Sequence, residues 1–308
     1  VKGEVITTPF TFVATANAIL CTGNLPIFVD IEVGSLNIDP KAIEAAINTN
    51  TKAIVATHCY GNPCDTKTIQ KIADKYNLRV IYDAAHAFGV EDTGGSILRH
   101  GDLSILSLHA TKVFTTFEGG CIIANDTEIT KTVTQLRNFG ISSEGQVVSV
   151  GLNAKMSEVH AALGLLQLNY VDSLIKKRSI IADLYKKNIG KIKGICVVQD
   201  TEITKPNYTY FPILIREDYP VDRDTLFKRM ADIGVNARKY FFPLITEFPA
   251  YKNLRPKNSL SLPNAKKASG QILCLPIYPD LELKNVAKIC DFLSNPEVPD
   301  VTPHIDSV

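Results

Sequence analysis

The feature that most constrains the fold is an alternation, along the first half of the chain, of short β-branched apolar runs with amphipathic helical patterns. Strands separated by helices in this way form a mainly parallel sheet covered by helices, so the sequence predicts an α/β fold. Asp39 followed by Pro40, and Asp65 before TKTIQKIADKY, are typical of helix starts. The expected strands of this half are 4–7, 26–31, 53–57, 78–83, 104–108 and 120–124.

The second half of the chain begins with a long amphipathic pattern from Met156 to about Lys187, which predicts one bent helix or two helices in tandem. Beyond it, β-type runs at 195–198 and 208–215 and a helical pattern near 223–233 predict a further α/β unit. We therefore expect a large domain over residues 1–187, including the long linking helix, and a smaller C-terminal domain over residues 188–308.

The charge balance and the cysteines argue against several classes of protein. The chain has 33 Lys and Arg and 32 Asp and Glu, so its net charge is close to zero and no basic surface for nucleic acid or anionic membrane is expected. No apolar run is long enough to cross a membrane. Seven scattered cysteines, mostly in apolar segments, indicate a reducing, cytoplasmic setting. The one close pair, Cys59 and Cys64, has no second CxxC partner, so no metal site is expected.

Lys112 is the first candidate for chemistry, because in HATKVFTTFEGG it follows an apolar run typical of a buried strand. Ligands of open α/β sheets bind at the carboxyl ends of the strands. A partly buried ammonium loses some of its preference for the charged form, and the neutral amine can attack a carbonyl group. Most lysines are solvated surface residues, so the neighbouring motifs must support this interpretation.

Asp83 and Ser107 supply that support. Asp83 ends the apolar run VIYD, where a carboxylate is costly unless a cation such as a protonated pyridine nitrogen pairs with it. The alternative is that Asp83 caps a turn. Ser107, five residues before Lys112, could donate to a phosphate, although a single serine more often has no such role. Lysine, acid and hydroxyl together predict a site for pyridoxal 5'-phosphate (PLP).

The succession of motifs from about Glu4 to Tyr185 resembles the DegT/StrS family of sugar aminotransferases. The resemblance implies the PLP-dependent transferase fold of the aspartate aminotransferase type. It also implies a homodimer with shared active sites that aminates keto-sugar nucleotides from glutamate, in amino-sugar synthesis for cell-surface polysaccharide. The matching stretches include TPFTFVATANAIL, TKAIVATHCYGNPCD, VIYDAAHAFG, LSLHATKVFTTFEGG and GLNAKMSEVHAALGLLQL, with a weaker continuation through ARKYFFPL and LPIYPDL.

Carried over residue by residue, the resemblance assigns five positions around the cofactor. Lys112 matches the lysine that binds the PLP aldehyde and then moves protons, and Asp83 matches the partner of the pyridinium nitrogen. His86 stands where many relatives carry a glutamine near the phenolic oxygen of PLP, and an imidazole can also donate there. Ser107 matches a phosphate-binding serine, and Phe12 matches the aromatic residue that stacks on the ring.

Further positions concern the partner subunit and the substrate. Asn153 matches an asparagine that reaches the phosphate of the neighbouring subunit, and Lys155 stands where relatives often carry arginine. Some relatives replace the lysine by histidine and dehydrate their substrate, but the position five residues after Ser107 is Lys112, which favours a transaminase. Residues assigned to the substrate region are His58, Tyr60, Lys155, Arg238 and Tyr240.

The expected reaction is transfer of the glutamate amino group to a 4-keto-6-deoxyhexose sugar nucleotide. The alternatives are a 3-keto sugar nucleotide transaminase, a sugar dehydratase, and a PLP-binding regulator without catalysis. Relatives carry a few dozen residues before the segment that matches VKGEVITTPF, including a helix start that faces the cofactor phosphate. We expect this part of the phosphate site either to lie outside the given sequence or to be weakened.

Overall fold

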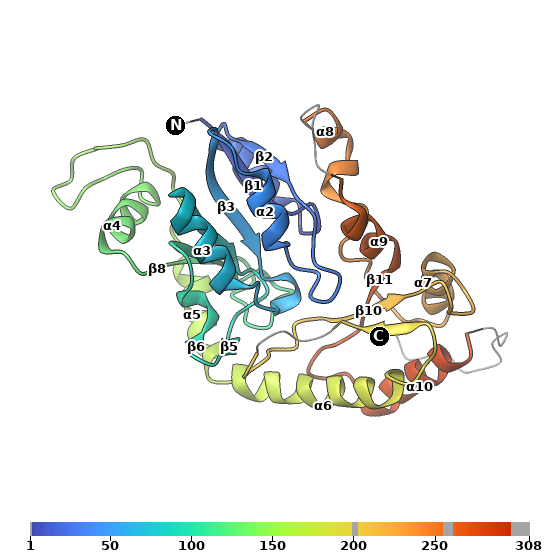
Figure 1. The fold of residues 1–308 in the computed structure, drawn as a ribbon. Helices are drawn as coiled ribbons and strands as arrows, with labels where there is room; N and C mark the ends of the chain where they lie inside the picture. Colours follow the sequence, from blue (N-terminus) through green and yellow to red (C-terminus); the bar gives the residue numbers. More distant parts are fainter. Residues whose placement is uncertain (1, 199–202, 255–260, 297–308) are drawn as a thin grey trace.

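The computed structural model describes residues 2–198, 203–254 and 261–296, which form two lobes (Figure 1). The larger lobe contains a six-stranded sheet in the order β2-β1-β3-β4-β7-β8. Neighbouring strands are parallel except β7 and β8, which are antiparallel, so the predicted mainly parallel sheet is confirmed. The strands are β1 (Glu4–Thr7), β2 (Leu25–Phe28), β3 (Thr51–Thr57), β4 (Arg79–Asp83), β7 (Leu103–Ser107) and β8 (Gly120–Ala124).

Helices connect these strands and cover the sheet. α1 (Ala14–Cys21) joins β1 to β2, while α2 (Pro40–Ala46) and α3 (Thr66–Tyr76) lie side by side over one face (Figure 1). The two predicted helix starts are confirmed, because Asp39 accepts the Lys41 N–H at 2.8 Å and Asp65 accepts the Thr68 N–H at 2.9 Å. Their inward residues complete an apolar core with the sheet, formed by Ile6, Ile38, Ile43, Ile54, Ile69, Ile72, Val80 and Tyr82.

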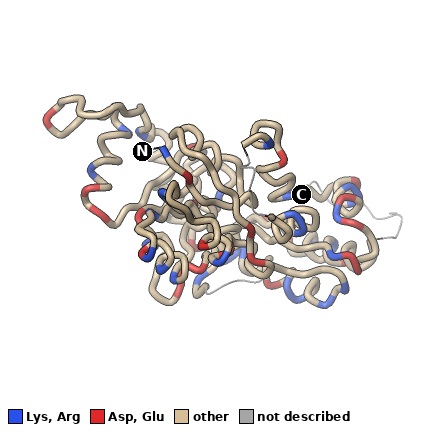
Figure 2. Tube along the Cα trace, turned by 45° about the horizontal axis from the view of Figure 1, so that its top comes forward, with Lys and Arg blue, Asp and Glu red and all other residues tan. Residues whose placement is uncertain are grey.

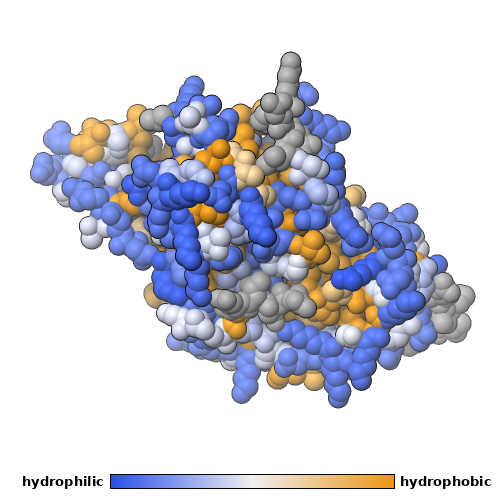
Figure 3. Space-filling model, viewed as in Figure 1, coloured by the Kyte–Doolittle hydropathy of each residue, from blue (hydrophilic) through white to orange (hydrophobic). Residues whose placement is uncertain are grey.

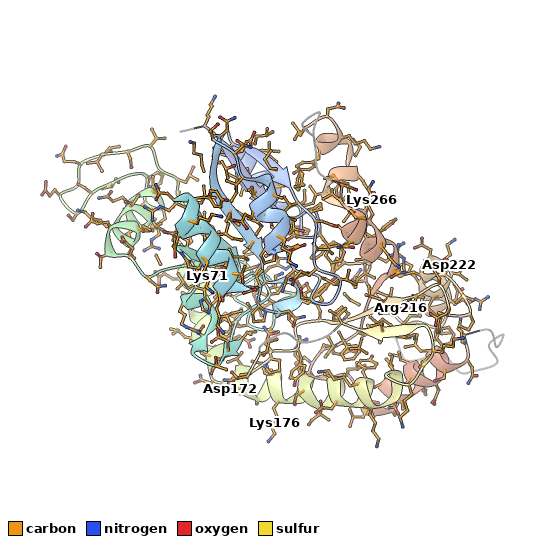
Figure 4. The ribbon with its side chains drawn as sticks, viewed as in Figure 1. Lys71, Asp172, Lys176, Arg216, Asp222 and Lys266 are labelled. Carbon is orange, nitrogen blue, oxygen red and sulfur yellow. The ribbon has the colours of Figure 1, made fainter. Side chains whose placement is uncertain are left out.

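The chain between β4 and β7 and the chain after β8 add shorter elements. A two-stranded hairpin pairs β5 (Glu91–Asp92) with β6 (Gly95–Ser96). After β8 come α4 (Thr127–Leu136), α5 (Glu158–Leu168) and α6 (Val171–Ile189), so the long helical pattern forms two helices in tandem. Asp172 and Lys176 of α6 point away from the molecule (Figure 4).

The smaller lobe is built on an antiparallel sheet in the order β11-β10-β9. β10 begins three residues later than predicted, because Tyr208 has a φ of 52°, which an extended strand does not adopt. The strands are β9 (Ile195–Val197), β10 (Phe211–Ile215) and β11 (Ile272–Leu275). The helices of this half of the chain are α7 (Arg223–Asp232), α8 (Pro249–Lys252), α9 (Pro263–Gln271) and α10 (Leu283–Ser294).

The core of the smaller lobe includes the last turns of α6. Ile181, Tyr185 and Ile189 pack in the same apolar cluster as residues of β10, α7 and α10. The helix therefore bridges the lobes, and the domain boundary between residues 187 and 188 stays a prediction. A second apolar cluster joins the two halves of the chain through residues that include Phe10, Leu36, Tyr60, Leu214, Phe241 and Cys274.

The surface and the cysteines add three observations. Lys and Arg are interspersed with Asp and Glu along the chain in Figure 2. In the described ranges no helix is long and apolar enough to cross a membrane. All seven cysteines are free, and the described residues contain no group of three or more His, Cys, Asp or Glu placed to hold a metal ion.

Candidate active site

Four strands of the large sheet end in polar residues at the same edge. Carboxyl ends of parallel strands meet at one edge, where open α/β sheets bind their ligands. Asp83 is half-buried there, with its Oδ1 accepting the Ala85 N–H at 3.1 Å and its Oδ2 accepting the Thr15 hydroxyl at 2.6 Å. The carboxylate is thus held in place and keeps acceptor capacity for a ligand. The four strand-end residues are Thr7, Thr57, Asp83 and Ser107.

Lys112 lies in the turn that follows β7, where its N–H donates to the His109 carbonyl at 3.0 Å. Its side chain is half-buried. Burial lowers the pKa of Lys112, and the negative charge of Asp83 acts on that pKa in the opposite direction. The ammonium and the carboxylate therefore lie within electrostatic range of each other, yet no ion pair joins these two described residues. The structure brings the predicted lysine and acid together and leaves them unpaired.

His86 lies beside them in a defined protonation state. Its Nδ1 accepts the Tyr60 N–H at 3.2 Å, so a neutral ring carries its proton on Nε2. Burial, assisted by the positive charge of Lys112, holds the pKa of His86 well below its ordinary value. The ring packs against Tyr210, with centroids 4.9 Å apart, and against Phe241. His86 can thus offer one N–H donor to a ligand.

Phe12 and Ser107 also lie near the carboxyl edge. The Phe12 side chain is 59% exposed, in the loop between β1 and α1, and so can stack on a ligand. Ser107 Oγ accepts the His109 N–H at 3.4 Å and is half-buried, which leaves its own proton for another acceptor. Both placements agree with the roles that the resemblance implies, and the roles themselves stay predictions.

Asn153 and Lys155 lie in the exposed segment between α4 and α5. The backbone of Asn153 forms an isolated bridge with Asn138, and the Asn153 amide has no hydrogen-bond partner in the part of the chain that the structure describes. Lys155 Nζ donates to Asn138 Oδ1 at 3.0 Å and lies 5.4 Å from the centre of the Phe139 ring. The free amide of Asn153 suits a contact beyond its own chain.

The structure argues against one substrate assignment. His58 has no exposed surface, its Nδ1 accepts the Cys64 N–H at 3.0 Å, and its ring stacks on Tyr82 with centroids 4.6 Å apart. Burial lowers the pKa of His58 to about 3. A side chain enclosed in this way cannot touch a substrate, so the role predicted for His58 is corrected to one of packing and turn formation. Sequence alone missed this because the motif THCYG does not show which way the ring turns.

Besides Lys155, three further substrate candidates lie between the lobes or on the surface. Tyr60 is buried, donates its hydroxyl hydrogen to the Tyr240 carbonyl and stacks on Phe241. Tyr240 contacts Tyr210 edge to face, with centroids 5.7 Å apart. Arg238 pairs through its backbone with Cys274 and exposes its side chain. Tyr60 and Tyr240 belong to an aromatic wall beside His86, and within the described residues no hydrogen bond, ion pair or ring contact joins the Arg238 side chain to that wall.

Sequence analysis missed Thr15, although its hydroxyl makes the shortest contact to Asp83. The threonine stands in TFVATAN, one residue inside α1, and is buried. Several threonines cluster in the stretch TTPFTFVAT, and buried hydroxyls require partners. That clustering was an available signal, but it could not identify the partner, which is 68 residues away.

The residues at this edge fit PLP. A carboxylate held by two donors can face a ring nitrogen, and a partly buried amine can bind an aldehyde. An exposed aromatic ring and a serine hydroxyl can contact the ring face and the phosphate.

Solved structures define the class. The chain superposes with a TM-score of 0.89 on DesI, determined in the presence of its TDP-sugar product, at 30% identity and covering 96% of this chain and 76% of DesI. Helicobacter pylori PseC, an aminotransferase involved in the biosynthesis of pseudoaminic acid, gives a TM-score of 0.88 at 30% identity, with 94% and 78% covered. The fold is that of PLP-dependent sugar aminotransferases, so the predicted fold is confirmed.

The family follows from the sequence. The pattern of the DegT/DnrJ/EryC1/StrS aminotransferase family matches residues 1–294, and the chain belongs to this family. The dTDP-4-amino-4,6-dideoxy-D-glucose transaminase of Shigella dysenteriae is 50% identical over 281 residues, which cover 91% of this chain and 76% of the relative. The Escherichia coli transaminase of the same name is 45% identical over 294 residues, with 95% and 79% covered. The family resemblance and the enzyme class are confirmed, and the family implies PLP as the cofactor.

Proposed function

We propose that this chain is a PLP-dependent transaminase that moves the amino group of glutamate to carbon 4 of a dTDP-linked 4-keto-6-deoxyglucose. The observation that carries the proposal is that Lys112 and Asp83 lie at the carboxyl edge within electrostatic range of each other and form no ion pair between them. The substrate is supported by the names of two relatives at 50% and 45% identity, both of which specify a 4-amino sugar on dTDP.

Two residues would supply the chemistry. When bound, PLP provides an electron sink and carries the amino group between the two substrates. Lys112 would bind the aldehyde of the cofactor and, as a free amine, accept and return a proton at the substrate carbon. Its lowered pKa raises the fraction of neutral amine that both tasks require. Asp83 would face the ring nitrogen and keep it protonated.

Three residues would position the cofactor. His86 has one N–H to donate, from Nε2, and would offer it to the phenolic oxygen where many relatives use an amide. Ser107 would donate its hydroxyl to the phosphate, and Phe12 would stack on the ring. Because burial keeps His86 neutral, its donor does not add a positive charge beside Lys112.

The lysine also separates the proposal from its alternatives. A dehydratase of this family would carry histidine at position 112, and the chain has lysine there. A 3-keto substrate has less support than a 4-keto substrate, because the two relatives described above act at carbon 4 by name. A regulator would bind PLP without a response to glutamate, which an experiment can decide.

The proposal includes a homodimer with shared active sites. Apolar side chains are exposed from β7 and β8 to α5, among them Ile105, Ile122, Leu136, Val150, Val159, Leu165 and Leu166. Hydrophobic residues also interrupt the hydrophilic surface at the α4 end of the molecule in Figure 3. Large exposed apolar patches mark interaction sites, and a second copy of the chain would cover these side chains. Asn153 would then lie near the phosphate of the PLP bound to that second copy. Seven free cysteines fit a reducing compartment, which we take to be the cytoplasm, with the amino sugar used for cell-surface polysaccharide.

The test is a product assay. Purified protein with PLP, glutamate and dTDP-4-keto-6-deoxyglucose should yield 2-oxoglutarate and a dTDP-amino sugar, followed by mass spectrometry, while the 3-keto isomer should yield little product. Lys112→Ala should lower turnover by roughly 10³-fold, within the range that proton-transfer groups contribute, and should remove the visible absorbance of lysine-bound PLP.

Lys71→Ala is the matched control, because Lys71 is an exposed lysine on α3 (Figure 4). It should match the unmodified protein in both measurements. Visible absorbance that survives Lys112→Ala would refute the assignment of the lysine. Bound PLP whose spectrum does not respond to glutamate would favour the regulator.

A further inference from the structure

A chain of buried threonine hydroxyls leads to Asp83 from within the large lobe. Thr57, which lies opposite Asp83 in the register of β3 and β4, donates to the Thr11 hydroxyl at 3.2 Å. The hydroxyls of Thr11 and Thr15 are 3.4 Å apart, and Thr15 donates to Asp83 Oδ2 at 2.6 Å. All three threonines are buried.

The direction of this chain follows from counting protons. Each hydroxyl has a single hydrogen to donate. The Thr15 hydrogen is used on Asp83, so in the contact between Thr11 and Thr15 the donor must be Thr11. All three hydrogens therefore point along the chain towards the carboxylate. Hydrogen bonds arranged head to tail polarise one another, which strengthens the last one.

The last bond has a competitor. The ammonium of Lys112 and the carboxylate of Asp83 attract each other, yet no ion pair joins them. The two carboxylate oxygens instead accept hydrogen bonds from the Thr15 hydroxyl and the Ala85 N–H. If Thr15 lost its hydroxyl, Oδ2 would be released, and the carboxylate could turn towards Lys112. A direct pair would occupy the space between the two groups and keep the amine protonated.

We propose that Thr15 is a positioning residue, which holds the Asp83 carboxylate away from Lys112 and aimed at the ring nitrogen of PLP, with Thr11 and Thr57 supporting it from behind. The inference rests on the proposed function. It concerns a residue that contacts neither substrate nor cofactor and acts through Asp83.

The test compares Thr15→Val, which keeps the shape but removes the hydroxyl, with Thr15→Ser, which keeps the hydroxyl. Three properties are measured on the purified chain: PLP affinity by absorbance titration, the rate at which the apoprotein takes up PLP, and the visible circular dichroism of bound PLP. Thr15→Val should weaken affinity roughly tenfold to a hundredfold, the factor expected for a lost hydrogen bond to a charged group. It should also slow uptake and change the dichroism, because the ring loses a fixed partner.

Thr15→Ser should keep all three properties within about threefold of those of the unmodified protein, which is a small change because a tenfold change in affinity corresponds to about 1.4 kcal/mol. Thr51→Val is the packing control, since Thr51 is a buried threonine at the first residue of β3, at the opposite end of that strand from Thr57 and the candidate site. This control should leave the three properties unchanged. If Thr15→Val fails to fold, Thr57→Val replaces it, with an expected loss of roughly threefold that Thr57→Ser reverses.

The outcomes separate this inference from the proposed function. Unmodified protein that does not bind PLP overturns both. Unmodified protein that binds PLP, with Thr15→Val equal to it in all three measurements, overturns the positioning role alone. Equal losses in Thr15→Val and Thr15→Ser, or an equal loss in Thr51→Val, overturn it too, because packing rather than the hydroxyl would then be responsible.

Discussion

α3 and α5 are helices of the same length, 11 residues each, and their side chains meet different surroundings. α3 buries Thr66, Ile69, Ile72 and Ala73 against its own sheet. α5 buries only Gly164, although its sequence EVHAALGLLQL is rich in apolar residues, and Val159 is 80% exposed. α4, which precedes it, buries no residue.

The two parts of the large lobe therefore have different packing requirements. The part around α2 and α3 completes its core within one chain. The part that contains α4 and α5 exposes apolar surface that water makes unfavourable. Under the proposed homodimer, this second part finds its packing partner in another copy. Four predictions test the contrast, in decreasing order of expected effect.

The largest effect is expected from charge on the exposed face of α5. Val159 and Leu166 are seven residues apart, on one side of the helix, and are 80% and 62% exposed. Val159→Glu with Leu166→Glu should raise the dimer dissociation constant by roughly 100-fold or more, because each carboxylate would be buried unpaired at the interface. Analytical ultracentrifugation gives the constant, and transamination should fall with the dimer fraction. Ile180→Glu, on exposed α6 surface outside the patch, should leave association unchanged, and a double variant that stays dimeric would contradict the proposed interface.

The next effect concerns stability in the two parts. Ile54 is fully buried in β3, and Ile54→Ala should lower the free energy of unfolding by about 2–5 kcal/mol through lost contacts and a cavity. Leu165 is 69% exposed. In the monomeric Val159→Glu, Leu166→Glu variant, the further change Leu165→Ala should alter the free energy of unfolding by less than about 0.5 kcal/mol. Urea denaturation measures both values. A large loss for Leu165→Ala in that monomer would show that α5 is packed within its own chain.

The third effect is a pH dependence in the buried part. The pKa of His58 is lowered to about 3 in the folded protein. As pH falls below about 6.5, the His58 ring therefore binds a proton in the unfolded chain but stays neutral in the folded protein. The stability linked to His58 is therefore complete above that pH and is lost as pH falls towards 3. Urea denaturation at pH 7 and at pH 5 measures the drop in the free energy of unfolding. This drop should be about 2 kcal/mol smaller in His58→Asn than in the unmodified protein. His109→Asn, at an exposed histidine, should follow the unmodified protein, and identical slopes for all three would contradict the burial argument.

The smallest effect distinguishes two buried tyrosines. The Tyr82 hydroxyl has no hydrogen-bond partner within the described residues, whereas the Tyr185 hydroxyl donates to the Pro276 carbonyl at 3.0 Å. Tyr82→Phe should therefore leave the unfolding free energy unchanged or raise it by up to about 1 kcal/mol. Tyr185→Phe should lower it by about 1 kcal/mol, and thermal denaturation can rank the two. The opposite ranking would indicate that Tyr82 is hydrogen-bonded in solution.

Much of the large lobe is predictable from local sequence patterns. β1 and β8 have the predicted bounds, and the helix starts at Asp39 and Asp65 are confirmed, because capping and periodicity are local properties. The predicted start of β10 is too early, since a positive φ at Tyr208 is not visible in a run of apolar and aromatic residues. The nearness of Lys112 and Asp83 could be predicted because Asp83 ends one strand and Lys112 follows another strand of the same parallel sheet.

The sequence by itself determined the family, the order of strands and helices along the chain, and the residue types of the candidate site, because these depend on local pattern and on strand ends that converge at one edge. Only the tertiary structure decided which side chains turn into that site. His58 turned into the core, and Thr15, 68 residues from Asp83 along the chain, became its closest donor. The physical reason is that a hydrogen bond depends on direction and on distances of a few tenths of an ångström, which packing between distant segments sets and local sequence does not.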